Sequence, residues 1–162
     1  MIKQFALAFA ASSALCFPAL SQEVIRHSTP GSTFPIARAV EVPAAKTIVY
    51  LSGAVPSVID EKADRATTAA YGDMETQTVN VLRSIEKTLA DLDLTLGDVV
   101  KMQAFLVAPD GEQLDFEGFM SGYTQFFGTT EQPNLPSRSV MTVAGLVSPG
   151  WLVEIEVTAV RP

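Results

Sequence analysis

The sequence predicts a single domain of the mixed α/β (α+β) class, with one mixed β-sheet and two helices on one of its faces. Two stretches carry apolar residues at helical spacing, and several others are rich in β-branched residues or alternate between apolar and polar side chains. Their order along the chain is β-β-α-β-α-β-β, which favours helices layered on a sheet. A length of 162 residues suits one domain and is sufficient to bury a core without disulfides or metals.

The first 21 residues are expected to be a cleaved signal peptide. Lys3 gives a positive start, an apolar stretch covers residues 5–20, and Ala19 and Ser21 place small residues at the −3 and −1 positions of a cut after Ser21. A buried helix or a short membrane anchor is the alternative, but the apolar stretch is shorter than a bilayer-spanning helix needs. The one cysteine of the chain lies in this segment, so the mature chain would have none, which suits the periplasm. No membrane association is expected after cleavage.

The mature chain is expected to begin with a flexible arm over residues 22–35, followed by the folded domain over residues 36–162. The arm is polar and rich in turn residues, and its His27, the only histidine, is expected to be a solvated surface residue. Strands are predicted over residues 36–42 and 47–51. The second of these is Thr-Ile-Val-Tyr-Leu, whose β-branched and aromatic side chains are typical of a buried strand.

The first helix is predicted from Asp73 onward, because aspartate is a common helix N-cap. Apolar residues follow it at steps of three, three, four and three, which places them on one helical face: Val79, Leu82, Ile85, Leu89 and Leu92. The segment before it, residues 56–72, is irregular.

A second helix and three strands are predicted in the remainder. The strands cover residues 99–107, 140–143 and 151–160, and the last alternates strictly between two faces. Gly128 ends the second helix. The apolar face of that helix is formed by Phe116, Phe119, Met120, Tyr123, Phe126 and Phe127.

Charge and composition exclude several classes of function. The formal net charge of −7 argues against a phosphate-backbone ligand, so no nucleic-acid partner is expected. One cysteine and one histidine exclude a disulfide framework and paired-histidine metal motifs. The sequence contains neither a phosphate-binding Gly-Lys-Ser/Thr loop nor a Gly-x-Ser-x-Gly nucleophile elbow. None of these counts excludes an enzyme that works with Arg, Glu and backbone groups.

Two features remain that could carry chemistry. Arg138 lies between a proline turn and an apolar strand, where a partly buried guanidinium could pair with a carboxylate through two hydrogen bonds. The alternative, which the residues alone favour, is an arginine in a structural salt bridge. Glu154 and Glu156 share one face of the last strand, and alternation alone favours a solvated face over a polar site.

Five short stretches occur in an order and spacing typical of one protein family. They are Tyr-Leu-Ser-Gly at 50–53, Gly-Asp-Val-Val-Lys-Met-Gln-Ala-Phe-Leu at 97–106, Asp-Phe at 115–116 with Tyr-x-x-Phe-Phe at 123–127, Leu-Pro-Ser-Arg-Ser at 135–139, and Val-Glu-Ile-Glu-Val-Thr-Ala-Val at 153–160. Together they resemble the RidA/YjgF family of reactive-intermediate deaminases, also called endoribonuclease L-PSP. The resemblance implies a chorismate-mutase-like fold and a homotrimer with active sites in the clefts between subunits.

The same resemblance assigns roles to three residues of this chain. It implies that Arg138 grips a substrate carboxylate, that Glu154 orients a water molecule, and that Ser52 lines the pocket. Arg138 and Glu154 would then be the catalytic pair.

Three further positions depart from the family pattern. Val140 stands where a cysteine is frequent, Ile36 where deaminases often have a tyrosine, and Met120 where an asparagine is expected. All three are expected to contact the substrate, and together they make the pocket more apolar.

The function implied by the resemblance is an enamine/imine deaminase that hydrolyses small 2-imino acids to 2-oxo acids and ammonia. Its ligand would be a small carboxylate-containing molecule, and the implied reaction needs neither a metal nor an organic cofactor. The alternative is a non-catalytic small-molecule-binding or chaperone-like protein of the periplasm. A ribonuclease activity is disfavoured by the acidic charge.

Overall fold

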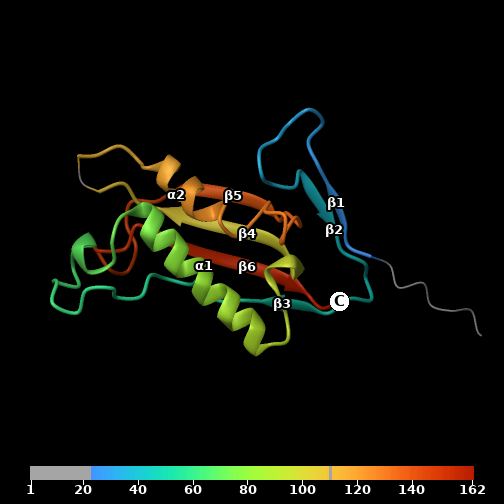
Figure 1. Cartoon of the computed structure of the whole chain (residues 1–162), viewed down its shortest axis with the longest axis horizontal. Helices are drawn as coiled ribbons and strands as arrows, with labels where there is room; N and C mark the ends of the chain where they lie inside the picture. Colours follow the sequence, from blue (N-terminus) through green and yellow to red (C-terminus); the bar gives the residue numbers. More distant parts are fainter. Residues whose placement is uncertain (1–22, 110) are drawn as a thin grey trace, which may run out of the picture.

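The computed structural model describes residues 23–109 and 111–162, so the predicted signal peptide lies outside the described residues. Figure 1 shows a sheet with two helices on one side and a separate two-stranded ribbon, β1–β2, at one end. None of the helices in the described ranges is long and apolar enough to cross a bilayer.

The main sheet has four strands in the order β3-β6-β4-β5. Its strands are β3 (Ile48–Tyr50), β4 (Val99–Leu106), β5 (Ser137–Thr142) and β6 (Val153–Val160). β4 runs parallel to β5, whereas β6 is antiparallel to both β3 and β4. The sheet is therefore mixed, as predicted, and β5 is one of its two edge strands.

The two helices are α1 (Met74–Asp91) and α2 (Phe116–Tyr123). Short 3-10 turns precede α1, at Thr68–Ala70, and β4, at Leu96–Asp98. The predicted cap at Asp73 is confirmed, because its carboxylate accepts a hydrogen bond of 2.9 Å from the backbone N–H of Thr76. Such a cap satisfies one of the free N–H groups of the first turn.

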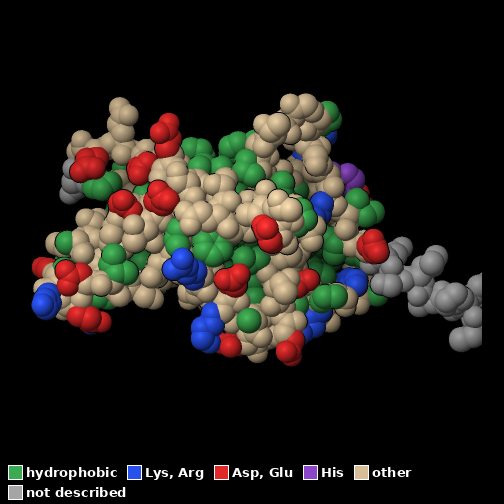
Figure 2. All heavy atoms as spheres, in the orientation of Figure 1, with side chains coloured by type: hydrophobic (Ala, Val, Ile, Leu, Met, Phe, Trp, Pro, Cys, Tyr) green, Lys and Arg blue, Asp and Glu red, His purple; other side chains and the backbone are tan. Residues whose placement is uncertain are grey.

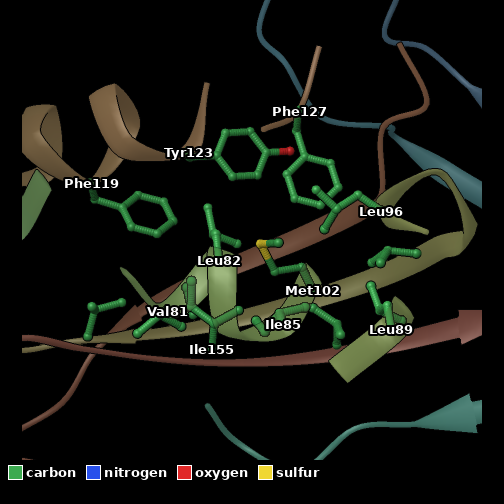
Figure 3. Packing of buried hydrophobic residues seen from close by; sticks show 14 of the residues in the cluster. Val81, Leu82, Ile85, Leu89, Leu96, Met102, Phe119, Tyr123, Phe127 and Ile155 are labelled. Carbon is green, nitrogen blue, oxygen red and sulfur yellow. The ribbon is translucent and has the colours of Figure 1, made fainter. Parts of the chain in front are cut away.

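Both helices bury their apolar faces against the sheet. Figure 3 shows Phe119, Tyr123 and Phe127 in a row over Leu82 and Met102. All five side chains are almost fully buried, and burial of this apolar area is the main stabilising contribution to the fold.

Two details of the predicted helices are wrong. Val79 is only partly buried and Leu92 is exposed, whereas Val81 joins the core, so the buried face of α1 is rotated relative to the predicted one. The helix that was predicted to reach Gly128 ends at Tyr123, and turns continue the apolar face as far as the buried Phe127.

The N-terminal arm is more structured than predicted. Within it, β1 (Ile25–His27) pairs antiparallel with β2 (Ala39–Glu41), so the strand predicted over residues 36–42 is shorter and lies outside the main sheet. Arg26 fixes this ribbon by donating hydrogen bonds of 2.7–2.9 Å to the backbone carbonyls of Gly97, Val99 and Leu135. The polar, turn-rich composition of the arm did not predict these hydrogen bonds, because the partners of Arg26 are about seventy or more residues away along the chain.

Candidate functional site around a buried arginine

The register of the sheet decides which way Arg138 points. Arg138 in β5 is paired with Met102 in β4, and residues paired across neighbouring strands project to the same face. Met102 is completely buried beneath the helices. Arg138 therefore projects to the helix-covered face, at the edge of the sheet.

Aromatic rings surround the Arg138 guanidinium. Its central carbon, Cζ, lies 4.1 Å from the ring centroid of Tyr123, 5.2 Å from that of Phe119 and 5.5 Å from that of Phe34. These distances are within the range of cation–π attraction, which offsets part of the cost of removing the cation from water. The site thus holds a positive charge in an apolar environment.

The hydrogen-bonding capacity of Arg138 is largely unused. One terminal nitrogen, Nη2, lies 3.2 Å from the sulfur of Met120, which is a weak acceptor. The other, Nη1, is buried and has no hydrogen-bond partner within the described part of the chain. No carboxylate of the described residues forms a salt bridge with Arg138. Burial lowers the pKa of this guanidinium, and the neighbouring Tyr123 partly opposes that shift.

A short strap, residues 34–37, lies beside the guanidinium. The Tyr123 hydroxyl donates a hydrogen bond of 2.9 Å to the carbonyl of Pro35, and the N–H of Ala37 donates one of 3.0 Å to the carbonyl of Pro136. These bonds position Phe34 against Arg138. Nothing in the sequence predicted this position for Phe34, the only Phe, Tyr or Trp of the predicted arm.

Three of the residues expected in the pocket are near Arg138 or on its face of the sheet. Met120 contacts the guanidinium, Val140 is paired with the buried Ala104 and packs against the core, and Ile36 lies in the strap. The three apolar residues that depart from the family pattern are therefore on the same side of the sheet as Arg138.

Glu154 and Ser52 are on the opposite side of the sheet from Arg138. Glu154 in β6 is paired with Phe105, which alternates with the buried Ala104 and Leu106 and so faces away from the helices. A Cβ atom on Gly53 would overlap the Glu154 carboxylate, so the absence of a side chain at Gly53 permits their close approach.

Ser52, directly before that glycine, is exposed. Glu156 is exposed on the same face as Glu154, in agreement with the alternation of the strand. Within one chain the sheet separates Arg138 from Glu154, so a substrate held by the first does not reach the second. Any site that uses both needs a second copy of the chain.

Charge on the surface is dispersed. Figure 2 shows acidic side chains scattered over the visible face, with basic ones between them and no continuous basic patch. Among the described residues no group of three or more His, Cys, Asp or Glu side chains is placed to hold a metal ion.

The fold and the site define a small α+β protein with an unpaired arginine buried at the edge of its sheet. The chain matches the family described as Endoribonuclease L-PSP over residues 27–161. It belongs to this family, which is the RidA/YjgF family, as the sequence motifs predicted.

Two relatives match most of the chain. It is 28% identical to a RutC family protein of Haemophilus influenzae over 142 residues, which is 88% of this chain and 98% of that protein. It is 32% identical to the 3-aminoacrylate deaminase RutC of Acinetobacter baylyi over 125 residues, which is 77% of this chain and 88% of the relative.

Solved structures have the same fold. The chain resembles E. coli TdcF with bound serine at a TM-score of 0.57 and 26% identity, covering 87% of this chain and 99% of that one. It also resembles the Rid-family protein YyfB of Yersinia pestis at a TM-score of 0.64 and 22% identity, covering 86% and 98% of the two chains. The predicted mixed sheet with two helices on one face is confirmed.

Proposed function

We propose that this protein is an enamine/imine deaminase that hydrolyses small 2-imino acids to 2-oxo acids and ammonia. The observation that carries the proposal is the partly buried guanidinium of Arg138, whose Nη1 is buried and which has no acidic partner in the described chain. A buried cation without a partner is costly, so a ligand carboxylate that supplies the missing charge would bind favourably. The similarity to a 3-aminoacrylate deaminase supports the same reaction class.

Arg138 supplies binding and orientation in this proposal. Its planar fork holds both oxygens of the carboxylate and thereby fixes the plane of the adjacent C=N carbon. Holding the reacting carbon near a bound water replaces a bimolecular encounter by a positioned one.

Glu154 supplies the proton transfer. Its carboxylate accepts a proton from the attacking water while the water oxygen bonds to the imine carbon. As the C=N π electrons pass to nitrogen, Glu154 returns this proton there and the neutral carbinolamine forms. Glu154 then accepts the proton of the new hydroxyl and passes it to the amine nitrogen, so that the C–N bond breaks, the C=O bond forms and ammonia leaves. One water is consumed and one ammonia is released, with no net change at the protein.

The two residues come from different subunits of a homotrimer in this proposal. The register of the sheet supports it, because Arg138 and Glu154 project to opposite faces of one chain. The face that carries Glu154 also has an exposed Tyr50 and Ile48 and is not covered by helices, which suits burial against a second copy.

A non-catalytic binding protein is the second candidate. Met120 and Ile36 replace the polar residues that resemblance leads us to expect, while Arg138 remains available for a carboxylate. A chaperone-like activity belongs to this second candidate. A ribonuclease is not proposed, because a net charge of −7 repels a phosphate backbone.

We also propose that the protein is exported to the periplasm after cleavage near Ser21. The charged start, apolar stretch and small residues of the first 21 positions support it. Mass spectrometry of protein recovered from the periplasm should give a mass that begins within two residues of Gln22. An intact Met1 terminus on exported protein would contradict the proposal.

The deaminase proposal is tested with the purified mature chain. Imines of 2-oxo acids are generated in situ by an amino-acid oxidase, and a trapping nucleophile competes with their hydrolysis. Wild type should divert imine from the trap to the 2-oxo acid, Arg138→Ala should not, and light scattering should give three times the chain mass. Carboxylate binding that depends on Arg138 without any diversion of imine would favour the binding protein instead.

A further inference from the structure

The aromatic ring of Phe34 differs from the other rings around Arg138. Phe119 and Tyr123 are completely buried in the core, whereas Phe34 is 45% exposed. Its ring centroid is nevertheless 5.5 Å from the guanidinium carbon. A single exposed phenylalanine is normal by itself. What distinguishes Phe34 is that its ring lies over an arginine with an unpartnered nitrogen.

The strap holds the backbone on both sides of this ring while the ring itself stays accessible. Pro35 and Ala37 are fixed by hydrogen bonds to Tyr123 and Pro136, and the N–H of Phe34 is held at 3.1 Å by the hydroxyl of Ser32. The ring is thus delivered to the outer side of Arg138. Of the three rings it can be displaced from the guanidinium at the lowest cost, because it has the least packing to lose.

Apolar groups also contact the guanidinium from the helix side. The sulfur of Met120 lies 3.2 Å from Nη2, and Phe119 lies beneath the same group. Once a carboxylate has paired with Arg138, the groups left to contact the rest of a ligand on this side are a thioether and aromatic rings. Such groups favour an apolar substituent and provide no hydrogen bonds to a polar one.

We propose that Phe34 and Met120 form an apolar subsite over Arg138 that selects 2-imino acids with branched aliphatic or aromatic side chains. The inference rests on the proposed function, because it names the substrate class of that same site. Phe34 moves off the guanidinium to admit the carboxylate and then covers the ligand's side chain. Phe34 and Met120 are specificity-determining residues in this proposal, and Arg138 remains the carboxylate anchor.

Binding of the stable 2-oxo acids to the full mature chain tests the proposal by calorimetry. The ligands are pyruvate, 2-oxobutanoate, 4-methyl-2-oxopentanoate and phenylpyruvate. Each additional methylene in an apolar subsite is worth roughly ten-fold or more, so 4-methyl-2-oxopentanoate should bind wild type at least about ten-fold more tightly than pyruvate.

Three variants separate specificity from folding. Phe34→Ala should weaken 4-methyl-2-oxopentanoate binding about ten-fold while pyruvate affinity changes less than about two-fold, and Phe34→Leu should restore most of the preference. Met120→Asn should also reduce the preference for 4-methyl-2-oxopentanoate over pyruvate, because the introduced amide must be desolvated beside an apolar ligand. Phe116→Ala is the matched control, since Phe116 is a similarly exposed phenylalanine, 38% exposed, whose ring lies 6.0 Å from that of Phe119 but does not itself contact the guanidinium.

The outcomes distinguish this inference from the proposed function. Equal affinity of wild type for pyruvate and 4-methyl-2-oxopentanoate would overturn the subsite, even if imines are hydrolysed. Loss of both ligands in Phe34→Ala would overturn it too, because Phe34 would then only stabilise Arg138. A preference that Phe34→Ala removes supports the subsite, and if imine hydrolysis is absent only the catalytic proposal fails. No Arg138-dependent binding of any 2-oxo acid would overturn both.

Discussion

Arg26 and Arg138 are two partly buried arginines of the same chain, yet their surroundings differ in kind. Burial lowers the pKa of both guanidinium groups, so desolvation does not distinguish them. Arg26 uses both terminal nitrogens to bond three backbone carbonyls, at 2.7–2.9 Å. Arg138 has rings and a sulfur around it and one buried nitrogen without a partner.

This difference separates a structural arginine, Arg26, from the candidate ligand-binding arginine, Arg138. Arg26 borders a cavity of about 550 Å³, so the shape of the surface alone would favour Arg26 as the ligand-binding arginine. Its donors are nevertheless committed to the backbone, and removing them would leave carbonyls unpaired. The donors of Arg138 are available, so the incomplete hydrogen bonding, and not the presence of a hollow, identifies the candidate site.

The largest effect is expected for Glu154→Gln. If Arg138 only anchors the carboxylate and Glu154 of a second subunit moves the proton, this variant should keep 2-oxo acid binding within about three-fold and reduce imine turnover roughly 10²–10⁴-fold. The amide still orients water but cannot accept its proton. Calorimetry and the imine-trapping assay measure the two quantities separately.

Glu156→Gln provides the control for that variant, because Glu156 is exposed on the same face of β6. Its turnover should equal that of wild type. An equal loss in both variants would mean that the negative charge of this face, and not a proton transfer at Glu154, supports the reaction.

Substitution of Arg138 should have the next largest effect. Arg138→Lys keeps a charge but loses the planar fork, so it should fail nearly as badly as Arg138→Ala. Losing a charge-assisted contact of this kind typically costs about 1.5–3 kcal/mol, or roughly ten- to hundred-fold in 2-oxobutanoate binding. Arg83→Ala, at an exposed position of α1, serves as the control. Unchanged binding in Arg138→Ala would remove Arg138 from the site.

Most of the main sheet and both helices were predictable because their signals are local. Strict alternation predicted the strand at Val153–Val160, and Asp73 with the spacing after it predicted α1. The ends of the elements were less predictable. β5 starts at Ser137 and not at Val140, because its pairing with β4 also includes the polar residues beside Arg138.

The candidate site was predicted less completely than the fold. Family resemblance identified Arg138 and Glu154, but alternation within β6 says nothing about which face of the sheet Arg138 occupies, since that depends on the register with β4. Phe34 was missed for a similar reason. Its position follows from hydrogen bonds that Pro35 and Ala37 make with residues 88 and 99 positions further along the chain, which no short sequence window contains.

Substitution of Arg26 should cost more stability than substitution of Arg138, the reverse of their expected effects on ligand binding. Arg26→Ala leaves the carbonyls of Gly97, Val99 and Leu135 without their donor, and should lower the free energy of unfolding by about 1–3 kcal/mol. Arg138→Ala removes a partly buried cation that lacks an acceptor, so its free energy of unfolding should stay the same or rise. Urea denaturation at neutral pH measures both. A larger loss for Arg138→Ala would show that Arg138 is the structural arginine of the pair.

The smallest effect at neutral pH is expected for Tyr123→Phe, which tests the aromatic surroundings of Arg138. Tyr123 is fully buried, stacks on Phe127 with ring centroids 5.1 Å apart, and donates one hydrogen bond, to Pro35. Phenylalanine keeps the ring over the guanidinium and removes only that bond, so the loss should be about 1 kcal/mol.

At alkaline pH the order of stability should be the opposite, with Tyr123→Phe more stable than wild type. Burial raises the pKa of the Tyr123 hydroxyl to about 12, and the nearby Arg138 only partly opposes that shift. The folded chain therefore keeps this proton at a pH where the unfolded chain, with an ordinary tyrosine pKa near 10, has released it. The stability that comes from Tyr123 is complete below about pH 10 and is lost as the pH rises toward 12, whereas Tyr123→Phe has no such contribution to lose. In urea denaturation from pH 9 to pH 11.5, the free energy of unfolding of wild type should therefore first approach that of Tyr123→Phe and then fall below it. A constant difference would mean that the Tyr123 hydroxyl reaches solvent and that the aromatic surroundings of Arg138 are open at Tyr123.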